Sequence, residues 1–223
     1  MTPDRAAGHS VPEEFLLDFA AGTAPEPVAV LIDSHVALDP ASRTKLRQLE
    51  TIGGALLNDV QPADVGPDAL DRVLARLGAQ EQPARRQRRA AAPAADPLPA
   101  PLSAYVPHGL ASLRWRYRGW GLSEATLACA TPGAYRMSLL RMGPGGRLPR
   151  HGHRGPEFIL VLTGGFSDQR GRYGRGDVCF ADETAEHKPV ADSDGECLCL
   201  AVMRGPVRFK GLLGLLLAPF VRD

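Results

Sequence analysis

The chain has 223 residues, of which 44% are hydrophobic and 23% are charged, and its net charge is +1. This length allows one large domain or two ordinary ones. No apolar run reaches the roughly 18 residues that cross a bilayer, the first residues lack the pattern of a secretory signal, and no cysteines form a CxxC pair. We therefore expect a cytoplasmic protein with no membrane partner and no disulfide framework.

The first residues predict two short amphipathic helices. Residues 10–13 have a capping-box pattern, and the helix that follows carries apolar residues at helical spacing up to Gly22. A second helix opens at Pro25 or Pro27 and stops before Pro40, because proline disfavours helical geometry in the residue before it.

Two further helices are predicted before residue 78. Asp39 and Pro40 have the character of an N-cap and a first helical residue, and Asp68 is a candidate cap for the last helix. Four short helices bury only a modest core, so a metal or a partner would add stability.

The helical region is acidic. Residues 1–77 carry 6 basic and 12 acidic side chains, a net charge of −6. This argues against direct nucleic-acid binding, because phosphate contacts need Lys and Arg. It favours a basic protein partner, with a solvated acidic surface that binds nothing as the alternative.

Residues 78–104 have the composition of a linker. Gln, Pro, Ala and Arg dominate, with a basic run at residues 85–89, and such a segment cannot bury apolar surface. The basic run could touch nucleic acid, although a solvated charge run is the commoner explanation. We therefore predict a helical domain over residues 1–77 and a second domain over residues 105–223, with the two free to move independently.

The second domain has the pattern of a β-structure. Short strand-like runs are bounded by Gly, Pro and Asp, which suggests a closed or double-sheet architecture. The predicted strands cover Ser112–Tyr117, Glu124–Ala130, Tyr135–Met142, Glu157–Thr163, Asp177–Phe180, Cys197–Val202 and Val207–Lys210.

One motif in this domain predicts a metal site. Gly145, His151, His153, Glu157 and Gly164 fit G-x5-H-x-H-x3-E-x6-G, which resembles the first conserved motif of the cupin superfamily. Two histidines spaced two apart on a strand project from the same face, and a glutamate on the next strand can close the site.

Residues 171–187 resemble the second cupin motif, although its internal Pro-x-Gly and its final Asn are missing, and they add His187 to the ligand set. The resemblance implies a cupin barrel of the double-stranded β-helix, or jelly-roll, type. With the helices predicted for residues 1–77, the fold expected is a two-domain α plus all-β protein with a small N-terminal helical bundle and a C-terminal cupin barrel. Three imidazoles and one carboxylate suit a divalent transition metal. Zinc is favoured, and iron, manganese or nickel are alternatives.

Two cysteines add a second feature to this domain. Cys197 and Cys199 lie two apart on a predicted strand, so both side chains can face the barrel interior near the metal. A thiol pair beside a metal could be oxidised and change the ligand set. The alternative is a pair of buried core cysteines without a redox role.

An acidic helical domain joined by a Pro-Ala-Arg linker to a cupin barrel resembles the ChrR-type cupin anti-sigma factors over nearly the whole chain. In the helical domain the likeness rests on His9 and on residues 13–22 and 35–43. It implies that the helices bind an extracytoplasmic-function sigma factor and that the cupin domain is needed for the response to oxidants.

The wider zinc-binding anti-sigma group carries H-x3-C-x2-C and an upstream histidine as zinc ligands. This chain keeps His9 and His35 but has Asp39 and Ser42 at the two cysteine positions. Aspartate can bind zinc, whereas serine is a poor ligand. The resemblance therefore implies no more than a weak N-terminal metal site on His9, His35 and Asp39.

Together these features predict a transcriptional regulator that is not an enzyme. Its acidic helices would sequester an extracytoplasmic-function sigma factor, and its metal-binding cupin domain would respond to oxidative stress. The alternative is a metal-dependent cupin dioxygenase or related oxidoreductase acting on a small molecule. A homodimer through the cupin domain is left open.

Overall fold

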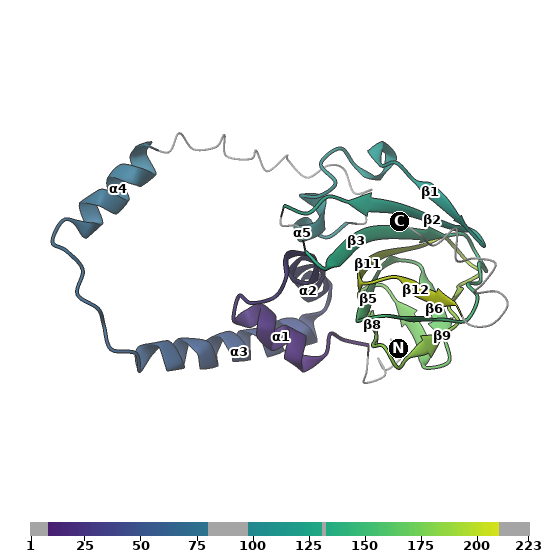
Figure 1. Ribbon diagram of the computed structural model, residues 1–223, viewed down its shortest axis with the longest axis horizontal. Coiled ribbons are helices and arrows are strands. Elements are labelled where there is room, and N and C mark those ends of the chain that lie inside the picture. The colour runs from purple at the N-terminus through teal and green to yellow at the C-terminus, as the bar shows by residue number, and fades with distance from the viewer. Residues whose placement is uncertain (1–8, 80–97, 131–132, 210–223) are drawn as a thin grey trace.

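The structure, a computed structural model, describes residues 9–79, 98–130 and 133–209. Four helices are followed by a domain of antiparallel strands, which confirms the predicted order of a helical region and a β domain (Figure 1). Most of the predicted linker, and Lys210 at the end of the last predicted strand, lie outside the described residues.

The four predicted helices are present. They are α1 (Glu13–Ala20), α2 (Glu26–Leu38), α3 (Pro40–Asn58) and α4 (Ala69–Ala79), and a short helix α5 (Ala100–Ser103) precedes the β domain. Asp39 caps α3 as predicted, because its Oδ2 accepts a 2.9 Å hydrogen bond from the Ser42 amide. The capping box predicted for α1 is wrong: the residue at the N-cap is Pro12, which has no side-chain hydrogen bond to offer.

The largest sheet has six strands in the order β1-β2-β3-β11-β5-β8. Their bounds are β1 (Arg116–Gly119), β2 (Leu122–Leu127), β3 (Tyr135–Met142), β5 (Glu157–Thr163), β8 (Val178–Ala181) and β11 (Cys197–Arg204). Two three-stranded sheets complete the domain, one in the order β10-β6-β7 and the other in the order β12-β4-β9. Their strands are β4 (His151–His153), β6 (Gly165–Asp168), β7 (Gly171–Gly174), β9 (Glu186–His187), β10 (Val190–Ala191) and β12 (Val207–Phe209).

Both faces of the six-stranded sheet are buried at its centre. Along β5, Phe158, Leu160 and Leu162 belong to one hydrophobic cluster, while Ile159 and Val161 belong to another. Successive side chains of a strand point to opposite faces, so one cluster lies between the sheet and the helices and the other lies inside the barrel. This explains why β5 and β11 have nearly continuous apolar sequences.

The first two helices pack against the sheet in one hydrophobic core. Leu31 and Ile32 of α2 are fully buried in the same cluster as Leu160 of β5. Phe15 of α1 meets Phe158 edge to face, with ring centroids 4.8 Å apart. The helical region and the barrel therefore share a core, which differs from the expected independent movement of two domains.

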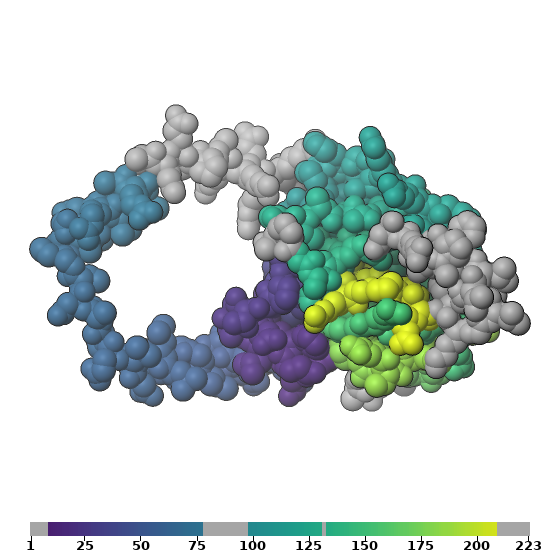
Figure 2. Space-filling view, viewed as in Figure 1, coloured from purple at the N-terminus to yellow at the C-terminus, as the bar shows by residue number. Residues whose placement is uncertain are grey.

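The second half of α3 and the whole of α4 stand away from this core (Figure 2). Their large apolar side chains are exposed: Ile52, Leu56, Leu57, Leu70, Val73, Leu74 and Leu77 each have between 52% and 71% of their surface accessible. The predicted apolar stripes are present, but among the described residues no element covers them.

The strand predictions were most accurate for the long central strands. Those for Glu124–Ala130 and Asp177–Phe180 overlap β2 and β8 with shifted ends, and β12 begins at the predicted Val207. Tyr135–Met142 and Glu157–Thr163 have the predicted bounds, whereas Ser112–Tyr117 was wrong at its start, because residues 110–112 form a 3-10 turn and the strand covers Arg116–Gly119. Strands β6, β7, β9 and β10 were not predicted. They have two to four residues each, too few to display an alternating pattern.

Candidate metal centre and barrel cavity

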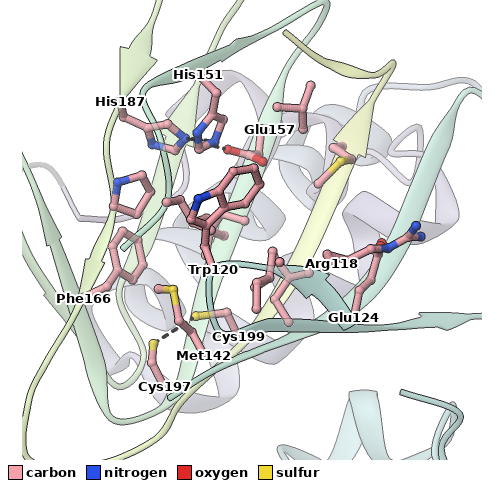
Figure 3. A pocket seen from close by; sticks show the side chains of 18 of the residues that line it. Arg118, Trp120, Glu124, Met142, His151, Glu157, Phe166, His187, Cys197 and Cys199 are labelled. Carbon is pink, nitrogen blue, oxygen red and sulfur yellow. Dashed lines mark hydrogen bonds and ion pairs between the residues drawn. The ribbon is translucent and has the colours of Figure 1, made fainter. Parts of the chain in front are cut away.

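Three imidazole nitrogens and one carboxylate oxygen converge inside the barrel. Figure 3 shows His151, His187 and Glu157 of this set. His151 and His153 come from β4, Glu157 opens β5, and His187 ends β9, which pairs with β4. His187 Nε2 lies 2.9 Å from His151 Nε2 and 3.3 Å from His153 Nε2. Glu157 Oε2 lies 3.0 Å from His153 Nε2 and 3.4 Å from His187 Nε2. All four residues are buried, and the cluster could hold a metal ion.

The protonation of His151 suits a metal ligand. Its Nδ1 donates a 2.8 Å hydrogen bond to the backbone oxygen of Pro149, so the lone pair on Nε2 faces the other three residues. Burial lowers the pKa of His151 to about 4, so the ring is neutral at pH 7. Neutral imidazole is the form that binds a metal.

Glu157 supplies the negative charge of the cluster. Burial alone would raise its pKa, but contact with His153 and the nearby imidazoles lower it to about 2. Its Oε2 is buried and makes no hydrogen bond with good geometry among the described residues. A buried carboxylate oxygen that faces three imidazoles is stabilised by a cation, so the donor set fits a divalent metal.

A carboxylate lies behind His187, on the side away from the other three candidate ligands, and the sequence analysis did not predict it. Asp168 Oδ2, in a fully buried side chain, lies 3.6 Å from His187 Nδ1. The same oxygen is held by Arg170 Nη2 at 3.1 Å, and Arg170 Nη2 also lies 2.9 Å from Cys179 Sγ. Metal-binding histidines are commonly oriented by a carboxylate on their other nitrogen. Asp168 lies in a short hairpin without a recognisable motif, so the sequence held no signal for it.

Cys197 and Cys199 both face the barrel interior, as their spacing predicts. Their sulfur atoms are 3.5 Å apart and both side chains are buried. Both also line the cavity that His151, Glu157 and His187 line. The hydrogen bond with Cys197 and burial raise the pKa of Cys199 well above its usual value, which keeps it a thiol at neutral pH.

This cavity has a volume of about 610 Å³. Trp120 reaches into it from the turn between β1 and β2, and in Figure 3 its ring lies between the histidine cluster and the cysteine pair. Trp120 has a positive φ of 51°, a conformation that L-residues adopt only at a cost. The turn therefore holds the indole at the cavity against a local backbone preference.

In the described part of the chain, His9, His35 and Asp39 do not form a group of three side chains that could hold a metal ion together. His35 Nδ1 donates to the backbone oxygen of Gly176, and Nε2 accepts from Ser42 Oγ, each at 2.8 Å. His9 instead packs on the ring of Tyr173, with centroids 4.4 Å apart. Asp39 is 3.8 Å from His35, but its carboxylate is engaged as the cap of α3.

Comparison with known proteins assigns the family. Residues 108–208 match the ChrR cupin-like domain. Over 219 residues the chain is 38% identical to the anti-sigma-E factor ChrR of Cereibacter sphaeroides, an alignment that covers 96% of this chain and 98% of that protein. The chain belongs to the family of ChrR-type cupin anti-sigma factors.

The fold agrees with this family. A crystal structure of Rhodobacter sphaeroides SigE in complex with the anti-sigma ChrR matches with a TM-score of 0.75 at 34% identity, covering 87% of this chain and 98% of that chain. ChrR-type anti-sigma factors are regulators and not enzymes. The family therefore confirms that this protein is not an enzyme and removes the dioxygenase alternative.

Other cupin structures are more distant. An acetylacetone dioxygenase from Acinetobacter johnsonii matches at 17% identity with a TM-score of 0.37, over 43% of this chain.

In the described residues of this ChrR-type chain, no helix combines the length and the apolar character needed to span a bilayer.

Proposed function

We propose that this protein sequesters an extracytoplasmic-function sigma factor with its N-terminal helices, and that its cupin domain holds a zinc ion and governs release under oxidative stress. The observation that carries the proposal is the uncovered apolar surface of α3 and α4. We call this the α3–α4 surface and define it by Ile52, Leu56, Leu57, Leu70, Val73, Leu74 and Leu77.

The α3–α4 surface has the properties of a protein-binding site. Exposed apolar helix faces mark interaction sites, and here α3 and α4, which do not pack on each other, each carry one. The surface lies on helices of a region with a net charge of −6, which complements a basic partner. The relative ChrR forms a complex with SigE, so a sigma factor is the partner that best fits this surface.

The remaining predictions from the sequence belong to the same proposal. The sigma-binding part covers residues 1–77 and the cupin domain covers residues 105–223. The linker predicted over residues 78–104 was wrong at its end, because Leu98 and Leu102 are buried in the core that the helices and the sheet share. A sigma factor acts on RNA polymerase, so the protein works in the cytoplasm. The proposal includes neither nucleic-acid nor membrane binding, and a homodimer through the cupin domain stays a prediction.

Zinc is the proposed metal because of the spacing of the four donors. A tetrahedral zinc site with bonds of about 2.0–2.1 Å has donor atoms roughly 3.3 Å apart. Four of the six donor pairs among His151, His153, Glu157 and His187 lie 2.9 to 3.4 Å apart, and all four donors lie within 4.8 Å of one another. Bound zinc would complete the cluster as a closed site of the kind found in structural and sensory centres.

The cysteine pair is the proposed redox element. Cys197 and Cys199 lie in the cavity beside the metal ligands, and their oxidation would change the shape of the wall that β11 forms. The purified complex with the sigma factor, treated with an oxidant, tests this role. A double Cys197→Ser, Cys199→Ser variant that releases the sigma factor as readily as the parent would remove the pair from the mechanism.

The main claim is tested by co-expression of the full chain with the sigma factors of its own organism. We expect one sigma factor to co-purify with the parent and to be lost from a Leu57→Asp, Leu74→Asp double variant. The matched control is Tyr117→Ser, which changes a side chain on the barrel that is also 71% exposed. If the double variant retains the sigma factor at the parental ratio, the α3–α4 surface is not the binding site.

A further inference from the structure

The strand β8 contacts both the barrel interior and the N-terminal helices. Its side chains alternate between the two, since Cys179 belongs to the interior hydrophobic cluster while Val178 and Phe180 pack in the cluster that the sheet shares with the helices. The ring of Phe180 meets that of Phe15 in α1, with centroids 5.5 Å apart. A shift of this strand would therefore change contacts on both of its faces.

Two hydrogen bonds also attach the N-terminal region to β8 and to the turn before it. His35 of α2 donates to the backbone oxygen of Gly176, and the Val178 amide donates to the backbone oxygen of His9, each at 2.8 Å. The position of β8 thus sets the surface on which α1 and α2 pack.

On the interior side, Arg170 holds β8. Its Nη2 donates to Cys179 Sγ at 2.9 Å, and its Nη1 donates to the backbone oxygen of Phe180. The same guanidinium binds Asp168 Oδ2, with Nη2 at 3.1 Å and Nε at 3.3 Å. The Arg170 amide also donates to Asp168 Oδ1 at 2.8 Å, so the hairpin between β6 and β7 fixes the two side chains together.

Asp168 connects Arg170 with the candidate metal centre. Its Oδ2 lies 3.6 Å from His187 Nδ1, while His187 Nε2 faces the other candidate ligands. A metal on Nε2 would fix the imidazole ring and favour an N–H at Nδ1 that points to the carboxylate. A continuous series of contacts therefore runs from His187 through Asp168 and Arg170 to β8.

We propose that Arg170 couples the metal centre to the N-terminal helices by holding β8 in place against Asp168 and His187. With metal bound, the His187 ring is fixed and β8 keeps the position on which α1 and α2 pack. Without metal the ring is free to turn, the interior side of β8 loosens, and the helices loosen with it.

This inference rests on the proposed function, because it requires a metal at the centre, and it adds a route by which that metal regulates the sigma-binding helices. Arg170 is a positioning residue, since it acts through Asp168 and β8 and is not among the candidate metal ligands.

Amide hydrogen exchange of the full chain, without a sigma factor, tests the coupling. Peptides from α1 and α2 are followed by mass spectrometry in zinc-loaded and chelator-treated protein. In the parent, removal of zinc is expected to raise their exchange rates about 10-fold, the size of an ordinary coupling between two sites. In an Arg170→Gln variant with zinc bound, the ratio should fall below about 2-fold. A purely structural role would raise exchange in both states and leave the ratio unchanged.

Two controls accompany this measurement. Arg172→Gln makes the same change two residues further along, where the guanidinium binds Asp192 at 2.6 Å, and it should keep the parental ratio. Peptides from β3, which is separated from β8 by β11 and β5, should exchange equally with and without zinc. They show whether the barrel stays folded in each sample.

Three results would overturn the proposal. The first is a parent that binds zinc but whose α1 and α2 exchange equally in both states. The second is a parental ratio in the Arg170→Gln variant. The third is an equal increase in β3, because zinc would then stabilise the whole barrel and not this connection.

Failure of the proposed function is recognised separately. A parent that takes up no zinc in elemental analysis removes the metal centre and, with it, this coupling. A sigma factor that does not co-purify contradicts the sigma-binding proposal alone, because the exchange measurement contains no sigma factor.

Discussion

His35 Nδ1 donates a 2.8 Å hydrogen bond to the backbone oxygen of Gly176, which joins α2 to the turn before β8. His35, predicted as a ligand of an N-terminal metal site, is used here to attach the helices to the barrel. Close by, the Val178 amide donates to the backbone oxygen of His9 at 2.8 Å. His9 and His35, both predicted as ligands of an N-terminal metal site, thus contact the same connection between β7 and β8.

His35→Ala is expected to destabilise the protein by about 2 to 4 kcal/mol. The change removes the two buried hydrogen bonds of the His35 ring and leaves a cavity in its place, since the side chain is only 1% exposed. Urea unfolding of the full chain measures the effect. His108→Ala, at an exposed position, is the control and should leave the free energy of unfolding unchanged. A loss no larger than that of the control would show that the junction contributes nothing to stability.

Elemental analysis of the purified full chain is expected to find about one zinc per chain. His153→Ala should reduce this value towards zero, since His153 is one of the four converging ligands. A double His9→Ala, His35→Ala variant should keep the parental value, because these residues are not gathered into a set of three ligands. A second zinc that is lost only from the double variant would restore the N-terminal site.

Asp168→Asn is expected to weaken metal binding about 10- to 100-fold without removing it. The carboxylate orients His187 through Nδ1, and changes of this kind in other metal proteins have effects of this size. Competition with a chromophoric chelator measures the affinity. Asp194→Asn, an exposed change in the loop before β11, serves for comparison. Equal affinities in the two variants would show that Asp168 does not position the ligand.

The metal-free protein is expected to lose stability as the pH falls from about 6.5 to about 4. In this window the unfolded chain protonates His151, whereas burial prevents protonation in the folded state. Proton binding thus favours the unfolded state, and His151 accounts for at most about 3 kcal/mol. Urea unfolding across this range measures the loss, and a His151→Gln variant should show a flatter profile. A slope unchanged in the variant would assign the effect to other groups.

The sequence predicted the parts of this protein that leave a regular pattern. The spacing of His151, His153 and Glu157 predicted three of the four residues that converge in the candidate metal centre, because alternation along a strand and the family motif both depend on residue intervals. The helices of the N-terminal region were also predictable, since apolar residues and prolines mark their lengths.

The parts that depend on tertiary contacts could not be predicted. Asp168 supports His187 across two strands that share no sequence motif. The packing of α2 on β5 was hidden as well, because an apolar stripe predicts burial but not the surface that buries it. A similar apolar stripe on α4 remains exposed, so the pattern alone does not tell which stripe is buried.

The shared core of the first two helices and the sheet affects how the protein can be divided. A fragment that begins at residue 105 would expose to water the sheet face that carries Leu139, Leu160 and Leu200, and we expect such a fragment to aggregate. In chimeras of two relatives, α1, α2 and the first half of α3 must accompany their own barrel, because Ser42 and Leu46 are buried with them, while the second half of α3 and α4 can be exchanged with less disturbance. The exchangeable unit therefore lies within the chain, between two segments that have to be inherited together.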